Sequence, residues 1–479
     1  MKLALIAMSG LRTYNPELTE LGMTLPGFLE RGKAIASLPS LGLLTLAGMT
    51  PDRFEVSYHE IQDIRQIDEL PACDLAAVST FTAQVKEAYA LAARYRTMGV
   101  RTVIGGLHAT ALPEEAARHF DAVVAGEGEI VWADVLREAE AGELSGIYRS
   151  AGREWDLADA PMPRFDLLDV ERYNRLTVQT TRGCPWRCEF CASSILLTPR
   201  YKVKPVEKTI AEIRAIKELW SHPFIEFADD NSFVNRRHAK NLLRALAEEN
   251  VRWFTETDIA ITDDPELLDL MRDSGCAQVL IGLESPNAAA LDGLETRKNW
   301  KRLRLDSYRE AIYRIQSRGI AVNGCFVLGL DGSTREDFAA VRNFVEESGL
   351  YEVQIAVLSA MPGTPLYARM RDQGRLLDPT GWERCTIFDV NVRPENMSAE
   401  ELQDGLIALG RELYGEEAKQ RRKRAFRQQW REGRKTAFAD RDQGASTQVP
   451  SERGKQPWPI RHLNRDSRGT TSSNGRTTV

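Results

Sequence analysis

The sequence predicts an α/β protein with two successive parallel sheets. An amino-terminal doubly wound domain is followed by a partial (β/α)6 barrel and a small carboxyl-terminal cap. Three observations predict this fold: short apolar runs alternate with helical patterns over residues 1–150, a proline-containing break follows, and a second alternating series of six strand–helix units begins near Leu176. Strands that alternate with helices form parallel sheets covered on both faces.

In the first domain, residues 1–150, the apolar runs indicate buried strands and the segments with helical spacing indicate the helices between them. The expected strands are residues 3–8, 54–59, 75–80, 102–106 and 122–125, and the expected helices are 85–98 and 130–141, with a further helix start at Pro113. The carboxyl ends of these strands carry small or polar residues. Because ligands bind beyond the carboxyl ends of the strands in such sheets, we expect a ligand site there.

The break at residues 151–172 contains Ala160-Pro161-Met162-Pro163 and serves as the linker. We place the barrel at residues 173–375, the cap at 376–415 and a basic tail at 416–479. The active site of such a barrel is expected at the carboxyl ends of its strands. The expected strands are 177–181, 225–228, 253–257, 278–283, 322–330 and 353–358, and the expected helices are 206–220, 237–249, 265–273, 303–317, 335–347 and 366–373.

The tail differs in charge from the rest of the chain. The formal net charge of the whole chain is −6, yet residues 416–479 contain sixteen Lys/Arg against seven Asp/Glu. We expect this tail to be disordered or loosely helical, because it ends in a Ser/Thr/Gly-rich run at 469–479. Nucleic-acid binding is one interpretation of the basic patch, and a solvated tail is the simpler one.

Composition excludes several classes of protein. A content of 43% hydrophobic and 28% charged residues excludes a mostly disordered or collagen-like chain. No apolar run approaches the ~18 residues of a membrane span, and the run at residues 3–8 is too short for a secretory signal. We therefore expect a cytoplasmic protein. Its seven cysteines, an odd number, favour metal binding or catalysis over a disulfide framework.

The strongest chemical signal is a cluster of three cysteines. Cys184, Cys188 and Cys191 stand at spacings of four and three residues, directly after the first expected barrel strand. Thiolates select iron–sulfur clusters, zinc or copper(I). A structural zinc site needs a fourth ligand, typically from a second pair of cysteines, and the remaining four cysteines are scattered along the chain. The pattern therefore favours an iron–sulfur cluster with one open iron.

This segment resembles the signature of the radical S-adenosylmethionine superfamily, C-x3-C-x2-C with an aromatic residue, here Phe190, before the last cysteine. The resemblance implies that the three cysteines hold a [4Fe–4S] cluster whose fourth iron binds S-adenosyl-L-methionine. One electron from the cluster then cleaves a carbon–sulfur bond, typically releasing a 5′-deoxyadenosyl radical. An external reductant such as a flavodoxin or ferredoxin is also implied.

Three further strand ends of the barrel fit this resemblance. Asp229 and Asp230 end the second strand, where one of them could anchor the ammonium or ribose of S-adenosylmethionine or could cap the helix that starts near Asn235. Glu284 ends a buried strand and needs a partner, either S-adenosylmethionine or an arginine. Gly329 stands where the family approaches the adenine, although glycines also mark ordinary turns.

The amino-terminal domain resembles the cobalamin-binding domain that precedes the barrel in one large branch of this family, so the resemblance covers roughly residues 1–375. The cobalamin-side residues that it implies are Ser79, Thr80, Gly105, Gly106, His108 and Gly126. The D-x-H-x-x-G motif, whose histidine ligates cobalt in some relatives, is absent. Cobalamin would be held without that histidine, or the domain has lost the cofactor. His108 could face the corrin or be structural.

The leading hypothesis is therefore a cobalamin-dependent radical enzyme that methylates an unactivated carbon, or phosphorus, of a small-molecule metabolite. One alternative is a non-methylating reaction on the same scaffold: cyclisation, rearrangement or aminocarboxypropyl transfer, with or without cobalamin. An alternative of another class is a non-catalytic iron–sulfur sensor with a nucleic-acid-binding tail, although nucleic acid is not the partner that we expect.

Overall fold

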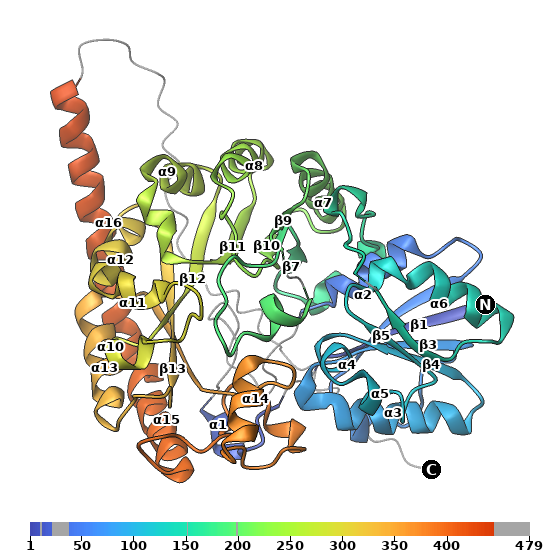
Figure 1. Cartoon of the computed structure of the whole chain (residues 1–479). Coiled ribbons are helices and arrows are strands. Elements are labelled where there is room, and N and C mark those ends of the chain that lie inside the picture. The colour runs from blue at the N-terminus through green and yellow to red at the C-terminus, as the bar shows by residue number, and fades with distance from the viewer. Residues whose placement is uncertain (10–11, 22–37, 151, 198–199, 445–479) are drawn as a thin grey trace, which may run out of the picture. The chain divides into compact units, whose positions relative to one another are not determined.

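The computed structural model describes residues 1–9, 12–21, 38–150, 152–197 and 200–444 (Figure 1). Residues 1–435 form one compact unit. Its described part contains two six-stranded sheets, in which all neighbouring strands are parallel, and one two-stranded antiparallel pair. The α/β class and both parallel sheets predicted from the sequence are confirmed.

The amino-terminal sheet has the strand order β2-β1-β3-β4-β5-β6. Helices α2 and α6 cover one face, and α3, α4 and α5 cover the other (Figure 1). Each face carries its own apolar core, as a doubly wound domain requires. The strands are β1 Lys2–Met8, β2 Glu55–Ile61, β3 Leu75–Ser79, β4 Arg101–Gly105, β5 Ala122–Ala125 and β6 Gly146–Arg149, and the helices are α2 Leu41–Met49, α3 Val85–Thr97, α4 Leu107–Ala111, α5 Pro113–Ala116 and α6 Trp132–Ala141.

Two of these elements carry no clear pattern in the sequence. Strand β6 lies at the edge of the sheet, and none of its residues is buried, so it lacks an apolar run. Helix α2 is apolar almost throughout, so no polar stripe reveals a helical period. The local signal for α2 is Ser40, whose Oγ accepts a hydrogen bond from the backbone N–H of Leu43 at 3.5 Å.

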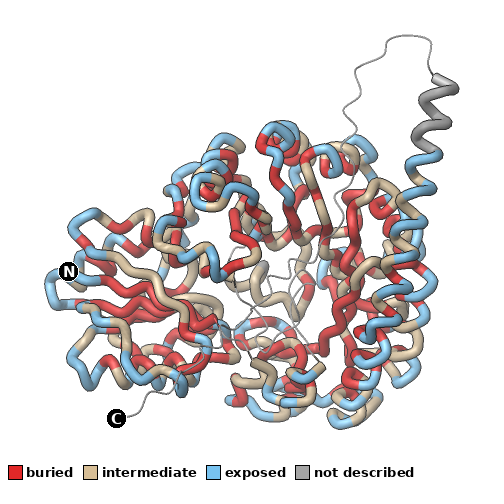
Figure 2. The backbone as a smooth tube through the Cα atoms, turned by 180° about the vertical axis from the view of Figure 1, so that it is seen from behind, coloured by how far each residue is buried: buried red, intermediate tan, exposed pale blue. Residues whose placement is uncertain are grey.

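The second sheet has the order β7-β10-β11-β12-β13-β14, so successive barrel strands are neighbours, as predicted. Buried residues follow the strands of both sheets, and exposed residues lie on the outer helices (Figure 2). The strands are β7 Leu176–Val178, β10 Phe224–Phe227, β11 Arg252–Thr257, β12 Cys276–Glu284, β13 Ala321–Leu328 and β14 Glu352–Val357. The principal helices are α7 Val206–Leu219, α8 Arg236–Glu249, α9 Pro265–Asp273, α11 Trp300–Arg304, α12 Tyr308–Gln316, α13 Glu336–Ser348 and α14 Pro365–Asp372.

The first expected barrel strand, 177–181, is divided in the structure. After β7 the chain leaves the sheet, and β8 Thr181–Arg182 pairs antiparallel with β9 Lys202–Val203. The physical reason is the carboxylate of Asp229, which accepts hydrogen bonds from the backbone N–H groups of Thr180 and Thr181 at 2.8 and 2.9 Å. These two donors are therefore not available to a neighbouring barrel strand.

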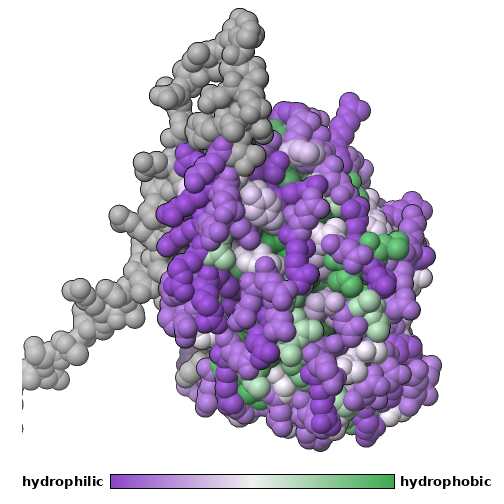
Figure 3. Space-filling model, turned by 90° about the vertical axis from the view of Figure 1, so that its left-hand side faces the viewer, coloured by the Kyte–Doolittle hydropathy of each residue, from purple (hydrophilic) through white to green (hydrophobic). Residues whose placement is uncertain are grey.

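The first part of the basic tail, for which we expected either disorder or a loose helix, is helical in the structure. After α15 Ala399–Tyr414, residues Glu416–Gly444 form α16. Buried Arg422 donates to the carbonyl of Leu413 at 2.7 Å, and Gln429 donates to the carbonyl of Ser348 at 3.0 Å. The face of the molecule that carries α16 is mostly hydrophilic (Figure 3). The Ser/Thr-rich run at 469–479 lies outside the described residues.

Among the described residues, no helix combines the length and the apolar character that a membrane crossing requires.

Docking of α16 can be tested through Arg422, because its side chain is buried and bonded to Leu413 and Tyr351 carbonyls. We expect Arg422→Ala to lower the free energy of unfolding by about 1–3 kcal/mol, since it leaves buried carbonyls without their donor. The matched control is Arg424→Ala on the exposed side of the same helix, which should leave the unfolding midpoint unchanged. Equal midpoints for both variants in calorimetry would contradict the docked arrangement.

Candidate active site

The three clustered cysteines lie on the segment between β8 and β9. The segment starts at Gly183, whose φ of 88° is the left-handed conformation that glycine adopts readily. The backbone N–H of Gly183 donates to Asp230 at 2.7 Å, and the N–H of Cys191 donates to the carbonyl of Cys188 at 3.1 Å. Glu189 N–H donates to the carbonyl of Leu294. The cysteine loop is therefore fastened to β10 on one side and to the segment after β12 on the other.

The sulfur atoms lie among groups that favour negative charge. Asn231 Nδ2 lies 3.5 Å from Cys184 Sγ, and the ammonium of Lys301 lowers the pKa of the Cys188 thiol. Burial is the larger effect, and it raises the pKa of Cys184 to about 11 and that of Cys188 to about 12. Without a metal, both thiols are therefore protonated at neutral pH.

Within the described part of the chain, no three His, Cys, Asp or Glu side chains converge closely enough to hold a single metal ion. Among these residues, the three cysteines are therefore not arranged around a single ion. In a [4Fe–4S] cluster each cysteine binds a different iron, so its ligands stand further apart than those of a single ion. Three thiols on one loop, beside an amide donor and an ammonium group, fit such a cluster.

Asp229 has a structural role in the described contacts. It is buried and accepts from the backbone of Thr180 and Thr181 and from the hydroxyls of Thr180 and Ser232. These contacts occupy its oxygens, so the interpretation of Asp229 as an S-adenosylmethionine anchor is not supported. The capping interpretation is also wrong, because the cap of α8 is Asn235 itself, whose side chain accepts from His238 N–H at 3.1 Å.

Asp230 holds the cysteine loop. Its carboxylate accepts from the backbone N–H of Gly183 at 2.7 Å and from the hydroxyl of Ser193. The adjacent acids, which both lie in the segment after β10, therefore have different partners.

Glu284 has a partner that the sequence did not indicate. Lys301 Nζ lies 2.7 Å from Glu284 Oε1 and 2.7 Å from the carbonyl of Gly282. Burial alone would lower the pKa of Lys301, but Glu284 raises it above its ordinary value. Glu284 has a φ of 64° and stands at an irregularity of the β12–β13 ladder. Such backbone strain is typical of functional sites.

The strand end at Gly329 serves packing. Gly329 has a φ of 78°, and a Cβ there would lie 2.4 Å from Leu402 Cδ2 of α15. The glycine thus allows close packing of the neighbouring helix, and its role beside an adenine ring stays a prediction. Phe190 packs against an apolar cluster that includes Leu330 and Leu358. Beside this cluster lies a cavity of about 230 Å³, lined in part by Glu189, Leu330 and Leu358.

The predicted cobalamin-side residues lie at the carboxyl ends of β3, β4 and β5. Gly106 has a φ of 105°, and a Cβ there would lie 3.0 Å from the carbonyl of Thr80 and 3.6 Å from Ser79 Oγ. Gly105 ends β4. Gly126, with a φ of 98°, donates its N–H to Thr110 Oγ1 at 3.0 Å. The structure therefore brings these residues together at one edge of the sheet.

His108 is not at that open edge. It is fully buried, with Nε2 3.3 Å from the Tyr89 hydroxyl and 3.4 Å from Glu115, and its ring meets Trp382 edge-on. Burial lowers its pKa. The interpretation of His108 as a corrin-facing residue is not supported, and the structural interpretation fits its surroundings.

The barrel has a polar inner wall that sequence analysis missed. Apolar residues such as Val279, Val322 and Val353 face the outer helices, so the alternate residues face inward. Several inward atoms are buried and have no hydrogen-bond partner in the described chain: Thr177 Oγ1, Gln278 Nε2, both amide atoms of Asn323, and Gln354 Oε1. Buried polar groups are normally bonded, so these atoms fit a non-protein partner such as water or a ligand. The missed signal was a polar residue, Gln278, Asn323 or Gln354, within each of three otherwise largely apolar strands.

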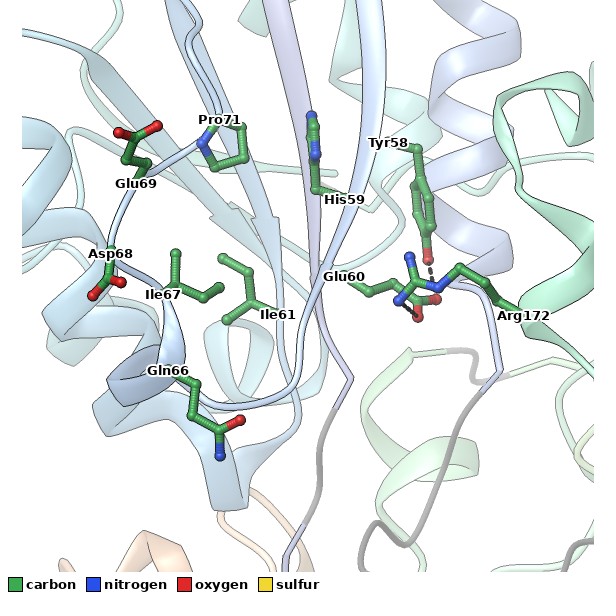
Figure 4. A pocket seen from close by; sticks show the side chains of 10 residues that line it. All are labelled: Tyr58, His59, Glu60, Ile61, Gln66, Ile67, Asp68, Glu69, Pro71 and Arg172. Carbon is green, nitrogen blue, oxygen red and sulfur yellow. Dashed lines mark hydrogen bonds and ion pairs between the residues drawn. The ribbon is translucent and has the colours of Figure 1, made fainter. Parts of the chain in front are cut away.

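A larger cavity, of about 410 Å³, lies beside β2 and contains none of the predicted site residues (Figure 4). Glu60 at its edge accepts hydrogen bonds from the hydroxyls of Tyr58 and Tyr173 at 3.1 and 2.8 Å. These contacts join the edge strand to the segment before β7.

Comparisons with known proteins match both halves of the chain. Residues 178–345 match the Radical SAM superfamily model, and residues 32–136 match the B12 binding domain model. The chain is 27% identical to a bacteriochlorophyllide d C-12(1)-methyltransferase of Chlorobaculum tepidum, covering 79% of this chain and 83% of that protein. It is 28% identical to a hopanoid C-2 methylase of Rhodopseudomonas palustris, and the match covers 71% of this chain and 66% of that protein. The fold is similar to that of the radical S-adenosylmethionine methyltransferase TsrM from Kitasatospora setae, with a TM-score of 0.62 and 16% sequence identity. This match covers 91% of this chain and 99% of that chain.

One inward residue provides a test of the polar wall by pH. Burial and the nearby carboxylate of Glu226 raise the pKa of Glu256 to about 8, whereas unfolded glutamic acid titrates near ~4.3. The folded state therefore holds a proton that the unfolded state loses, and stability falls as pH rises from ~5 to 8, by at most ~1.4 kcal/mol per pH unit.

Glu256→Gln removes the titrating group, so the unfolding free energy of this variant should not fall with pH for this reason. The difference in unfolding free energy, variant minus unmodified protein, should therefore increase as pH rises from ~5 to 8. Denaturant unfolding at several pH values measures the difference. Glu347→Gln on the exposed face of α13 is the control and should parallel the unmodified protein. A pH-independent difference for Glu256→Gln would contradict the protonated, inward-facing carboxyl.

Proposed function

We propose that this chain is a cobalamin-dependent radical S-adenosylmethionine enzyme that methylates an unactivated carbon, or phosphorus, of a small-molecule metabolite. The observation that carries the proposal is the presence in one chain of a B12 binding domain and a radical SAM domain. Methyltransferases that match over most of this chain support it further.

We assign the [4Fe–4S] cluster to Cys184, Cys188 and Cys191, and cobalamin to the edge formed by Ser79, Thr80, Gly105, Gly106 and Gly126. When bound, the cluster supplies the electron for cleavage of S-adenosylmethionine, and cobalamin supplies a carrier for the methyl group. Phe190, within the cysteine loop, and Glu284, at the end of β12, are the proposed contacts to S-adenosylmethionine.

The chain's own residues position and shield these groups. Asp230 fixes the start of the cysteine loop through Gly183, and Asn231 donates toward Cys184. Lys301 balances the buried charge of Glu284 beside Cys188. The unpartnered amides of the barrel wall offer donors and acceptors to polar groups of a substrate.

The reaction also needs an electron from outside the chain. We propose a flavodoxin or ferredoxin as the reductant, and the cytoplasm as the location, because three unpaired thiols stay reduced there.

Product analysis tests the proposal. The protein is purified without oxygen and reconstituted with iron, sulfide and cobalamin, and visible spectra report both cofactors. A methylase forms S-adenosylhomocysteine and 5′-deoxyadenosine together, and the product gains the mass of one methylene. Formation of 5′-deoxyadenosine without S-adenosylhomocysteine would instead indicate a non-methylating radical reaction.

The cluster assignment gives a sharper prediction. Cys188→Ala should abolish reductive cleavage of S-adenosylmethionine and lower the iron content, because a cluster ligand is lost. Cys73→Ala is the matched control, since Cys73 is also unpaired but belongs to the amino-terminal core. Iron analysis and 5′-deoxyadenosine formation measure both variants. Unchanged cleavage by Cys188→Ala would refute the assignment.

A further inference from the structure

Four charged side chains join the amino-terminal domain to the cysteine loop. Arg182 Nη1 lies 2.9 Å from Glu127 Oε1, and Arg182 Nη2 lies 2.7 Å from Glu129 Oε1. Lys202 Nζ lies 2.9 Å from both oxygens of Glu127. Two carboxylates of one domain thus meet two cations of the other, and the charges of this group cancel.

The group is removed from solvent. The side chains of Glu127 and Glu129 are 8% and 10% exposed, and those of Lys202 and Arg182 are 12% and 18% exposed. Burial alone would raise the pKa of Glu127, but hydrogen bonds from Lys202 and Arg182 hold it below its usual value. Further hydrogen bonds fix the cations: Arg182 donates to Gln179 Oε1, and Lys202 donates to the carbonyl of Trp155 at 2.8 Å.

The topology makes these contacts significant for the site. Arg182 and Lys202 are register partners in the β8–β9 pair, and the segment between them carries all three clustered cysteines. Both ends of that segment are therefore fastened to one loop of the amino-terminal domain. That loop, residues 126–129, follows β5 directly, at the edge assigned above to cobalamin.

A buried ion-pair network contributes little net stability, because desolvation of the charges offsets their attraction. Such a network instead fixes geometry, because a planar guanidinium that bridges two carboxylates is held in orientation as well as in distance. An apolar contact of similar area would hold the domains together without fixing the loop to this degree.

We propose that Glu127, Glu129, Arg182 and Lys202 form a latch that sets the distance between the cysteine loop and the carboxyl edge of the amino-terminal sheet. Arg182 is its central positioning residue, because it contacts both glutamates. The inference rests on the proposed function, since the distance matters only if a cluster and cobalamin occupy the two sites. A displacement of ~1 Å between reacting groups can lower a rate by ~100-fold.

The test measures the separation of the two cofactors without any substrate. The full chain is reconstituted with cluster and cobalamin and then reduced. Electron paramagnetic resonance then measures the magnetic coupling between cob(II)alamin and the reduced cluster, which weakens steeply with their separation. Arg182→Gln should bind both cofactors in the same amounts as the unmodified protein, but with a coupling that is weaker by roughly twofold or more, because the loop is no longer held.

Arg182→Lys and Glu129→Gln are milder variants that each remove one contact, and both should give intermediate coupling. The matched control is Arg53→Gln, which breaks the exposed Arg53–Glu140 pair of the same domain and should leave the coupling unchanged. Thermal unfolding verifies that each variant is folded.

Unchanged coupling in Arg182→Gln would overturn the latch while leaving the proposed function intact. Loss of cobalamin from a variant that keeps its cluster would also overturn it, because the group would then act in binding rather than in positioning. Absence of either cofactor from the reconstituted unmodified protein would refute the proposed function, and the latch with it.

Discussion

The geometry of the site depends on two adjacent carboxylates at the end of β10. Asp229 takes the backbone donors of Thr180 and Thr181, so the chain leaves the barrel sheet directly after β7. Asp230 takes the backbone donor of Gly183, the residue before the first clustered cysteine. Charge-assisted hydrogen bonds to backbone N–H groups are among the stronger ones. Both carboxylates follow the same strand. Because they are neighbours, they fix two positions relative to each other: the point where the chain leaves the sheet and the point where the cysteine loop begins.

Much of the fold could be predicted, because parallel strands buried on both faces leave apolar runs, and the helices between them leave a helical period. The cysteine loop could be predicted because its ligands are neighbours in sequence. The partners of Asp229, Glu284 and Gly329 could not, because they are set by tertiary contacts: Lys301 lies on a short helix without a pattern of its own, and Leu402 belongs to α15. The helical tail was obscured by its basic composition, although Arg422, Phe426 and Gln429 recur at helical spacing on its docked side.

The barrel divides its two faces between stability and chemistry. The outward residues of the strands pack into the largest apolar cluster of the described chain, and this burial supplies the stabilisation of the domain. In a closed barrel of eight strands the interior is filled by packed side chains, whereas here the inward positions carry Gln278, Asn323 and Gln354 with unpartnered atoms. Each such atom costs about 1–3 kcal/mol if nothing bonds to it. The stability of the barrel must therefore come from its outer face. The inner face is available to bind a molecule that enters the barrel.

The same separation of tasks applies to the junction between the two sheets. If the contact there were only apolar, it would tolerate sliding, because hydrophobic attraction has no preferred direction. Hydrogen-bonded ion pairs are directional, and the Arg182 guanidinium must match two carboxylates at once. On the facing edge of the amino-terminal sheet, Gly106 and Gly126 both have positive φ angles, which glycine adopts readily. The ion pairs at the junction therefore fix the cysteine loop against the loop that follows β5 in orientation as well as in distance.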